Sequence, residues 1–367
     1  MRTLIVAGAE GDFLYDEAGR RYINFSESTN ILGHRNPEVM RIISECMKQG
    51  FIHYPLTVSF PKVAEEVAGG IEGLSGMPGA SCVFTSSGSE ACDAALSVMS
   101  GLGPVVTVEG GYHGNTGQFM RKKETDRLKY GSEFEIPFPH DESVLGEMEA
   151  LVRKGARSII VEPVQAEGGF RKVYDSFLRD LRRDFSDLVI CVDECYTGFG
   201  KTGRPFSYQW FGIRPDILVI GKALGGGLPV GMAIFDGHMR ESPVLGAFRN
   251  GAFGSSAGNV MALHVARYII SVVSEPRFLR GVESRSRIID SSGEALKRRL
   301  RGMGLVRGLG LSSRNEASLF HGMLMERGVF ATPMSDAVRI CPPLTVGVEN
   351  LRAGIGEMEE ALQELEH

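Results

Sequence analysis

A lysine and an aspartate, each following a short apolar run, are the residues of this sequence best placed to do chemistry. Residues 188–192 lead into Asp193, and residues 217–220 lead into Gly221 and Lys222. Runs this short, rich in β-branched residues and bounded by turn signals, predict buried strands rather than helices. In an open α/β sheet, ligands bind at the carboxyl ends of the strands. We therefore expect the Asp193 carboxylate and the Lys222 amine to reach one crevice from different strands.

An amine and an acid placed in this way match the requirements of a pyridoxal phosphate site. A lysine forms a Schiff base with the cofactor, and an acid pairs with its pyridinium nitrogen. Glycines at 225–227 follow the lysine, where the backbone must approach something closely. The spacing alone fits equally well with a surface aspartate and a lysine that extends into solvent. Other segments therefore have to decide between the two interpretations.

Two further segments could contact a cofactor. Residues 86–90, Ser-Ser-Gly-Ser-Glu, follow a predicted strand at 81–85 and precede a predicted helix. Backbone N–H groups at such a helix start can bind an anion, although an ordinary helix cap has the same sequence. Tyr112 lies among glycines after the predicted strand 104–108. Its ring could stack on a planar ligand or pack within a loop.

Composition excludes several classes of protein. The chain has 367 residues, 43% hydrophobic and 23% charged, with a net charge of −5 and no block of like charge, so we expect neither nucleic acid nor an acidic membrane as partner. Its six cysteines form no C-x-x-C pair, which favours buried free thiols, a reducing cytoplasm and no metal. The apolar run 4–9 is too short for a signal peptide, and no run approaches the ~20 residues of a membrane span.

Strand-like and helix-like segments alternate between about residues 80 and 235, which predicts an α/β fold with a mostly parallel central sheet. Residues 12–24 predict a hairpin, 38–49 a helix, and 349–365 an amphipathic helix. We expect an N-terminal segment (1–48) packing with a small domain, a large cofactor-binding domain (49–260) and a smaller α+β domain (261–367). A dinucleotide motif is not found after the first strand. Gly200-Lys201-Thr202 is only a fragment of a P-loop, because the first glycine of that motif is missing.

Five segments together carry a family resemblance. They are D-E-x-x-T-G-F-G-K-T-G with P-D-I-L-V-I-G-K-A-L-G-G-G-L-P-V-G in 193–231, S-G-S-E-A at 87–91, G-G-Y-H-G at 110–114, E-P-V-Q-A-E-G-G at 162–169 and R-I-C-P-P-L at 339–344. On these residues the chain resembles the class III pyridoxal-phosphate aminotransferases, of fold type I, over about residues 12–362. Any one segment could arise by chance, whereas five in the family's order are highly specific.

The resemblance implies a role for each matching residue. Lys222 would hold pyridoxal 5'-phosphate as a Schiff base, and Asp193 would bond its ring nitrogen. The other cofactor-binding residues that it implies are Gly88 and Ser89 at the phosphate, Tyr112 and Cys195 on the two ring faces, Gln165 at the ring hydroxyl, and Ser255 or Ser256 reaching the phosphate of a partner subunit. The substrate would contact Arg339, Glu167 and Glu162. Glu167 can also pair with Arg339. A homodimer with shared sites is therefore expected.

The same comparison leaves the reaction open. Asn115 follows Y-H-G where many ornithine and γ-aminobutyrate relatives carry arginine, and this looks like the glutamate-1-semialdehyde aminomutases. R-I-C-P-P-L instead looks like the acetylornithine, ornithine and 4-aminobutyrate branch. Tyr196 replaces a common glutamine, with no consequence that the sequence reveals. The leading interpretation is ping-pong transfer of an amine from an ω-amino donor to a 2-oxo acid such as 2-oxoglutarate. Alternatives are an aminomutase, a decarboxylating pyridoxal-phosphate enzyme and a non-catalytic binder of a phosphate ligand.

Overall fold

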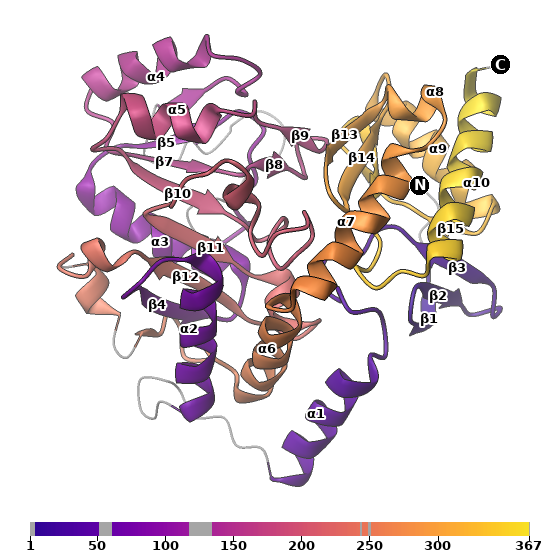
Figure 1. The fold of residues 1–367 in the computed structure, drawn as a ribbon, viewed down its shortest axis with the longest axis horizontal. Coiled ribbons are helices and arrows are strands. Elements are labelled where there is room, and N and C mark those ends of the chain that lie inside the picture. The colour runs from indigo at the N-terminus through magenta and orange to yellow at the C-terminus, as the bar shows by residue number, and fades with distance from the viewer. Residues whose placement is uncertain (1–3, 51–60, 117–133, 243, 249–250, 367) are drawn as a thin grey trace.

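The computed structural model describes residues 4–50, 61–116, 134–242, 244–248 and 251–366. Two lobes lie side by side in Figure 1, and helix α7 (Pro276–Asp290) runs from one toward the other. Helix α1 (Pro37–Lys48) extends away from both lobes. Among the described helices, none has the length and apolar content needed to span a membrane.

The larger lobe is built on a seven-stranded sheet in the order β4-β12-β11-β10-β7-β5-β6. Its strands are β4 (Ser81–Thr85), β5 (Val105–Val108), β6 (Glu135–Ile136), β7 (Ser158–Val161), β10 (Val189–Asp193), β11 (Ile217–Ile220) and β12 (Gly231–Phe235). Strands β6, β5, β7, β10 and β11 pair in parallel, and β12 is antiparallel to both of its neighbours. The predicted α/β fold with a mostly parallel sheet is confirmed.

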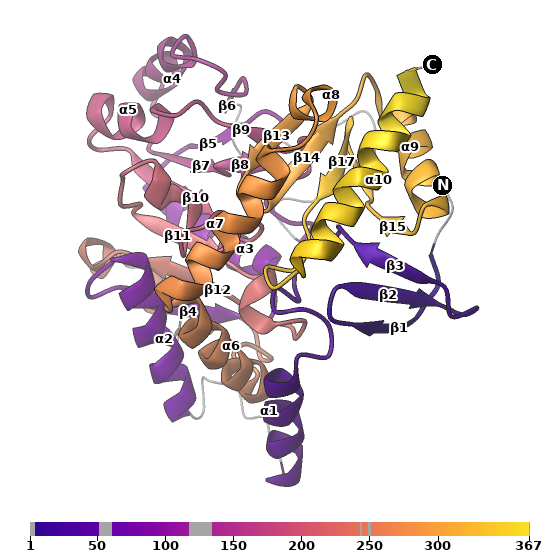
Figure 2. The same ribbon diagram turned by 45° about the vertical axis from the view of Figure 1, so that its right-hand side comes forward.

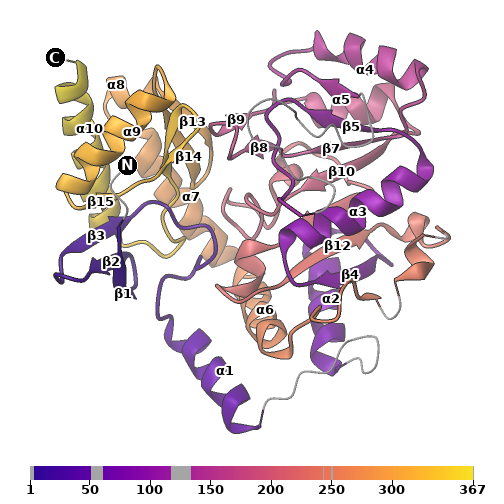
Figure 3. The same cartoon turned by 180° about the vertical axis from the view of Figure 1, so that it is seen from behind.

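Helices cover both faces of this sheet, which is why its strands are apolar throughout. In β11, Ile217 and Val219 pack on one face with helix α3 (Gly88–Leu102), which lies in front of the sheet in Figure 3. Leu218 and Ile220 point to the other face and join the larger core. The helices of that larger core are α2 (Lys62–Ser75), α4 (Val144–Arg153), α5 (Phe177–Asp184) and α6 (Val260–Val273).

The smaller lobe combines both ends of the chain, as Figure 2 shows. Its antiparallel sheet has the order β13-β14-β17-β16, and a second sheet, β1-β2-β3-β15, joins the N-terminal hairpin to a C-terminal strand. The strands are β1 (Val6–Glu10), β2 (Phe13–Asp16), β3 (Arg21–Asn24), β13 (Leu300–Met303), β14 (Val306–Gly310), β15 (Val329–Phe330), β16 (Pro333–Met334) and β17 (Ala337–Ile340). Helices α8 (Glu294–Lys297), α9 (Arg314–Glu326) and α10 (Val348–Glu366) complete it.

A two-stranded sheet, β8 (Val164–Gln165) and β9 (Arg171–Lys172), lies where the two lobes meet, with β9 next to β13. The hairpin predicted at 12–24 is β2 and β3, and the helix predicted at 349–365 is α10. Strand β1 and helices α4 and α9 were not predicted. The division of the chain at residues 48 and 260 stays a prediction.

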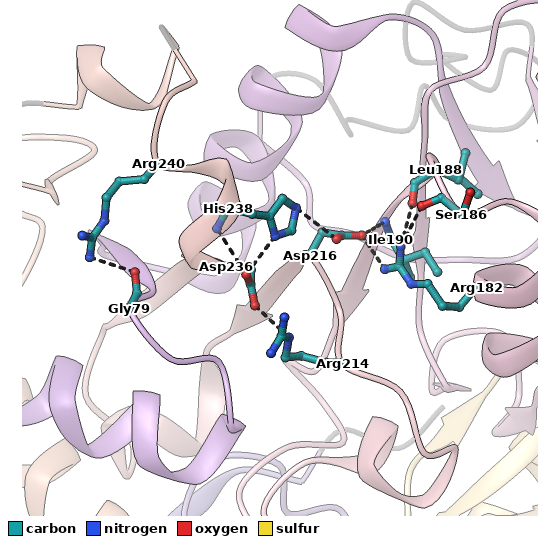
Figure 4. Close-up of polar contacts among 10 residues, drawn as sticks. All are labelled: Gly79, Arg182, Ser186, Leu188, Ile190, Arg214, Asp216, Asp236, His238 and Arg240. Atoms are coloured by element: carbon teal, nitrogen blue, oxygen red, sulfur yellow. Dashed lines mark hydrogen bonds and ion pairs between the residues drawn. The ribbon is translucent and has the colours of Figure 1, made fainter.

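At one edge of the central sheet a network of charges joins the ends of β11 and β12 (Figure 4). Asp216 precedes β11 and Asp236 follows β12, so the antiparallel pairing places them side by side. His238 lies between them, with Nδ1 2.8 Å from Asp236 Oδ1 and Nε2 3.3 Å from Asp216 Oδ1. Arg182 lies 2.6 Å from Asp216, and Arg214 lies 3.0 Å from Asp236. Each carboxylate therefore has an arginine as its counter-charge.

Candidate functional site

At the other edge of the sheet, the structure brings Asp193 and Lys222 together. Asp193 ends β10 and pairs in register with Val219 of the parallel strand β11, and Lys222 follows three residues after Val219. The Lys222 charge favours ionisation of the Asp193 carboxylate, so the two groups share one site. Parallel strands align their carboxyl ends, which is why acid and amine meet here.

Asp193 is a buried carboxylate held in its ionised form. His113 Nδ1 lies 2.9 Å from its Oδ2, the Cys195 amide donates to its Oδ1 at 3.0 Å, and Cys92 Sγ donates to Oδ2 at 3.4 Å. Burial opposes ionisation, but the hydrogen bond and charge of His113, with the Cys195 amide and Lys222, lower the pKa of Asp193 below its ordinary value. An anion in this position can keep the nitrogen of an aromatic heterocycle protonated.

Glu162 is shifted in the opposite direction. Its Oε2 accepts a hydrogen bond of 2.8 Å from the Tyr112 amide. Burial, with the charge of Asp193 adding to it, raises the pKa of Glu162 to about 7, although His113 and Lys222 oppose the shift. Two carboxyl groups with pKa values moved apart are typical of a site that handles protons.

Helix α3 begins where a phosphate could bind. Its N-cap is Ser87, whose Oγ accepts the Glu90 amide at 3.2 Å. A Cβ on Gly88 would lie 2.6 Å from Cys195 Sγ, and a Cβ on Gly221 would lie 2.9 Å from Gly88 Cα. Only glycine fits at these two positions, because the start of α3 packs directly on the backbone that precedes Lys222. The amides and dipole of a helix start favour an anion.

Lys222 opens a short 3-10 helix, Lys222–Gly225, in a left-handed conformation with φ 41°. Such a φ is uncommon for a residue other than glycine and is characteristic of functional sites. Its Nζ lies 4.9 Å from the centroid of the Tyr196 ring. Within the described residues the amine forms no hydrogen bond or ion pair, so it is available for covalent chemistry.

The remaining expected cofactor contacts differ in how they are placed. Cys195 Sγ packs beside Gly88 and Gly221, and Tyr112 is half-buried. Gln165 is buried, with Nε2 donating to the Glu109 carbonyl at 3.0 Å and Oε1 accepting Arg171 Nη2 at 2.8 Å, so both ends of its amide already have partners. Ser255 and Ser256 are exposed in the loop before α6.

Arg339 on β17 approaches the site from the smaller lobe. It is half-buried, and Nη2 contacts Met334 Sδ at 2.7 Å. Within the described residues it has no carboxylate partner, and its buried Nε has no hydrogen bond. Glu167 is exposed and forms no ion pair with Arg339 in this structure. A partly buried guanidinium without a counter-ion is suited to bind the carboxylate of a small molecule.

Two residues near the site were not singled out from the sequence. His113 orients Asp193, and the signal for it was its position directly after Tyr112 in a glycine-rich strand end. Lys201 is buried, and its Nζ donates to the carbonyls of Ser28 and Tyr196 at 2.7 Å each. Burial, and then the charge of Lys222, lower the pKa of Lys201 to about 7. Its only sequence signal was a fragment of a P-loop motif.

These residues fit pyridoxal 5'-phosphate. The helix start with its close-packed glycines suits the phosphate, the ionised Asp193 suits the ring nitrogen, and the unengaged Lys222 amine suits the aldehyde. The neighbouring Cys92 thiol lowers the pKa of Cys195, but burial together with the charge of Asp193 outweighs it and raises this pKa above its ordinary value, so Cys195 remains a neutral thiol. A neutral thiol is an apolar surface against which a ring can pack.

Comparisons with known proteins agree with this chemistry. A family model described as Aminotransferase class-III matches residues 1–362. Acetylornithine aminotransferase of Bacillus cereus is 30% identical, with 96% of this chain and 93% of that protein covered. A putative [LysW]-aminoadipate semialdehyde/glutamate semialdehyde transaminase of Pyrobaculum aerophilum is 29% identical, with 96% and 94% covered.

Several solved structures with the same fold are described as transaminases. A transaminase from the marine bacterium Virgibacillus has a TM-score of 0.85 at 20% identity, covering 99% of this chain and 93% of that one. An omega transaminase from Pseudomonas jessenii, solved in complex with PMP, has a TM-score of 0.83 at 21% identity, with 99% and 93% covered. At this identity the structural likeness shows the fold alone.

Proposed function

The chain belongs to the class III aminotransferases, which use pyridoxal 5'-phosphate to transfer amino groups, and we propose that it moves the amine of an ω-amino donor to a 2-oxo acid such as 2-oxoglutarate. Donor and acceptor react in turn at the same site. The relatives named for acetylornithine and for semialdehydes of aminoadipate and glutamate support a donor whose reacting amine is terminal.

The observation that carries the proposal is Arg339. This half-buried arginine of β17 has no carboxylate partner in the described residues. Its charge acts on Tyr196, whose ring centroid is 4.9 Å from Lys222 Nζ. A planar guanidinium binds a carboxylate through two parallel hydrogen bonds, so it suits an oxo acid better than a neutral substrate. The charges of Glu167 and Arg339 both act on the Tyr196 hydroxyl. In our proposal, Glu167 pairs with Arg339 when the bound substrate has no carboxylate for Arg339 to bind.

When bound, the cofactor supplies an electron sink that stabilises negative charge at the substrate carbon next to the amine. Lys222 would hold the cofactor, and its amine, when free, would move a proton at that carbon. Asp193 would keep the ring nitrogen protonated, and His113 holds Asp193 in place. Gly88 and Ser89 would bind the phosphate, Tyr112 and Cys195 would contact the ring, and Gln165 would contact the ring hydroxyl. Glu162, which accepts the Tyr112 amide, borders the substrate.

Assembly and compartment are part of the same proposal. Ser255 and Ser256 are exposed in a single chain, as expected of residues that reach the phosphate site of a partner subunit. We place the enzyme in the cytoplasm as a homodimer with shared sites. Six free cysteines agree with a reducing compartment.

One observation favours a second candidate, an intramolecular aminomutase of the glutamate-1-semialdehyde type. Asn115 stands where ornithine and γ-aminobutyrate relatives carry arginine. Its backbone amide donates to Ser89 Oγ at 3.4 Å, and the Ser89 hydroxyl donates to Asn115 Oδ1 at 3.5 Å. Because asparagine is neutral, this position offers no cation to a donor carboxylate.

A substrate panel separates the candidates. ω-Amino acids, diamines and α-amino acids are each incubated with 2-oxoglutarate or pyruvate, and without any oxo acid. We expect glutamate to form from an ω-amino donor and 2-oxoglutarate. Turnover of a single substrate without an oxo acid would establish the aminomutase instead, and release of carbon dioxide would establish a decarboxylating enzyme.

The role of Arg339 is tested in the same assay. Arg339→Ala is expected to raise KM for the oxo acid about 10²-fold, which is the scale for loss of a desolvated charge pair. Arg301→Ala is the matched control, because Arg301 belongs to the same lobe but is already paired with Asp336 at 2.9 Å. An unchanged KM in Arg339→Ala would remove Arg339 from the site.

A further inference from the structure

Tyr196 lies three residues after Asp193 and between two lysines. Its ring centroid is 4.9 Å from Lys222 Nζ and 5.0 Å from Lys201 Nζ. Phe170 packs against it edge-on, with centroids 6.1 Å apart. The side chain is only 6% exposed, so the ring is fixed by what surrounds it. The ring of Tyr196 therefore lies next to the reacting amine.

The hydroxyl of Tyr196 is directed toward the smaller lobe. Tyr196 packs in one cluster with Met334 and Cys341, and Arg339 Nη2 contacts the same Met334 at 2.7 Å. The groups that act electrostatically on the hydroxyl include Arg339 and Glu167, which are the two expected substrate ligands of this side of the site. The other end of Tyr196 is therefore near the group that receives the substrate carboxylate.

This buried hydroxyl has no oxygen or nitrogen as hydrogen-bond partner among the described residues. Its polar neighbour is the Cys341 thiol, a weak acceptor whose own hydrogen is directed to the Arg307 carbonyl at 3.5 Å. A buried hydroxyl without a strong partner destabilises a fold, so its presence needs a compensating reason. Burial holds its pKa well above the ordinary value, so the group remains a neutral O–H donor. What its surroundings lack is a strong acceptor.

We propose that the Tyr196 hydroxyl donates a hydrogen bond to the oxo-acid carboxylate that Arg339 binds. The inference rests on the proposed function, because it requires Arg339 to be the carboxylate receptor. The carboxylate then takes hydrogen bonds from a guanidinium of the smaller lobe and from a hydroxyl of the larger lobe. Tyr196 is thus a substrate-binding residue that favours acceptors with a carboxylate at this end.

Tyr196→Phe tests this directly, because it removes one poorly paired atom and leaves the ring beside both lysines. We expect KM for 2-oxoglutarate to rise about ten- to a hundredfold, the range for one hydrogen bond to a charged group, with kcat changed less than about threefold. Binding of glutarate, a dicarboxylate that cannot react, is measured by calorimetry and should weaken by the same factor. The Tm should not fall, since no strong hydrogen bond within the protein is lost.

Tyr208→Phe is the matched control. Tyr208 is also buried, and its hydroxyl donates to the Ser75 carbonyl at 2.6 Å, away from the site. This variant should show the reverse pattern, a lower Tm with unchanged KM and glutarate affinity. If Tyr196→Phe behaves in that way, or keeps the KM and glutarate affinity of the parent protein, Tyr196 is structural and the inference is wrong.

A double variant separates this inference from the proposed function. In the Arg339→Ala background, Tyr196→Phe should raise KM much less than it does alone, because both residues bind one carboxylate. Equal effects in both backgrounds contradict the inference while leaving Arg339 in place. If Arg339→Ala itself leaves KM and glutarate affinity unchanged, the receptor assigned in the proposed function is wrong.

Discussion

Asp193 and Asp236 are both buried aspartates with a histidine beside them, and they lie at opposite edges of the same sheet. His113 is 2.9 Å from Asp193, and His238 is 2.8 Å from Asp236. Asp236 also has Arg214 at 3.0 Å as a permanent counter-charge. Within the described residues no arginine pairs with Asp193. A charge that does act on it is that of Lys222, whose amine is needed for chemistry.

The difference between Asp193 and Asp236 shows how a charge that takes part in chemistry can be distinguished from one that holds strands together. At the edge with His238, each acid has a fixed counter-charge. At the edge with Lys222, burial opposes ionisation of Asp193, but His113, the Cys195 amide and Lys222 together lower the pKa of Asp193. Burial raises the pKa of Glu162 to about 7. Groups shifted in opposite directions within one small space are poised for proton transfer.

The largest effect is expected from Lys222→Ala. It should lower kcat by about 10³-fold or more, because the residue both holds the cofactor and moves the proton. Borohydride reduction, which fixes the pyridoxyl group on Lys222 of the parent protein, should leave the variant unlabelled. Lys62→Ala, at a lysine whose side chain is 86% exposed, should change neither result. Turnover of Lys222→Ala at the parent rate would contradict the assignment.

Next in size is a pair of substitutions, one at each edge. Asp193→Asn should lower kcat about 10²-fold or more, the scale for a lost electrostatic group at a reacting centre. Asp236→Asn should leave kcat unchanged and lower the free energy of unfolding by about 1–3 kcal/mol, since it weakens the interactions that the buried Asp236 carboxylate forms with His238 and Arg214. If both variants lost activity equally, or both lost only stability, the contrast between the edges would disappear.

Glu162→Gln should have a smaller effect, visible as a dependence on pH. The pKa of Glu162 rises from 4.5 to about 7 on folding, so between these values the folded protein keeps a proton that the unfolded chain has lost. The contribution to stability is therefore full below pH 4.5 and lost as the pH rises to about 7. The variant should lack this decline in Tm. If Tm depends on pH in the same way for the variant and the parent protein between pH 4.5 and about 7, the pKa of Glu162 is not raised by its surroundings.

The smallest effect is expected from His238→Ala. The His238 side chain is 56% exposed, and exposed ion pairs contribute about 0–1 kcal/mol. Chemical denaturation should show a loss within that range, and kcat and KM should be unchanged. A loss of activity would mean that the two edges are coupled.

Sequence patterns were sufficient for the placement of Lys222 and Asp193, because strand ends and a parallel sheet determine which side chains share an edge. They could not reveal His113 beside Asp193, since the two are 80 positions apart and only the folded chain brings them together. The bond from Lys201 to the Ser28 carbonyl spans 173 positions for the same reason. The antiparallel direction of strand β12 could not be predicted either, because an apolar run does not specify the direction of a strand in the sheet. Membership of the family could be predicted, since its motifs lie in unbroken segments.

The left-handed backbone at Lys222 sets the requirements of folding against those of catalysis. Glycine would adopt this φ without steric cost, whereas a lysine must be held there by its surroundings. The fold therefore gives up some stability at this position to present an amine. A Lys222→Gly protein would adopt the same turn without this steric cost but would lack the amine.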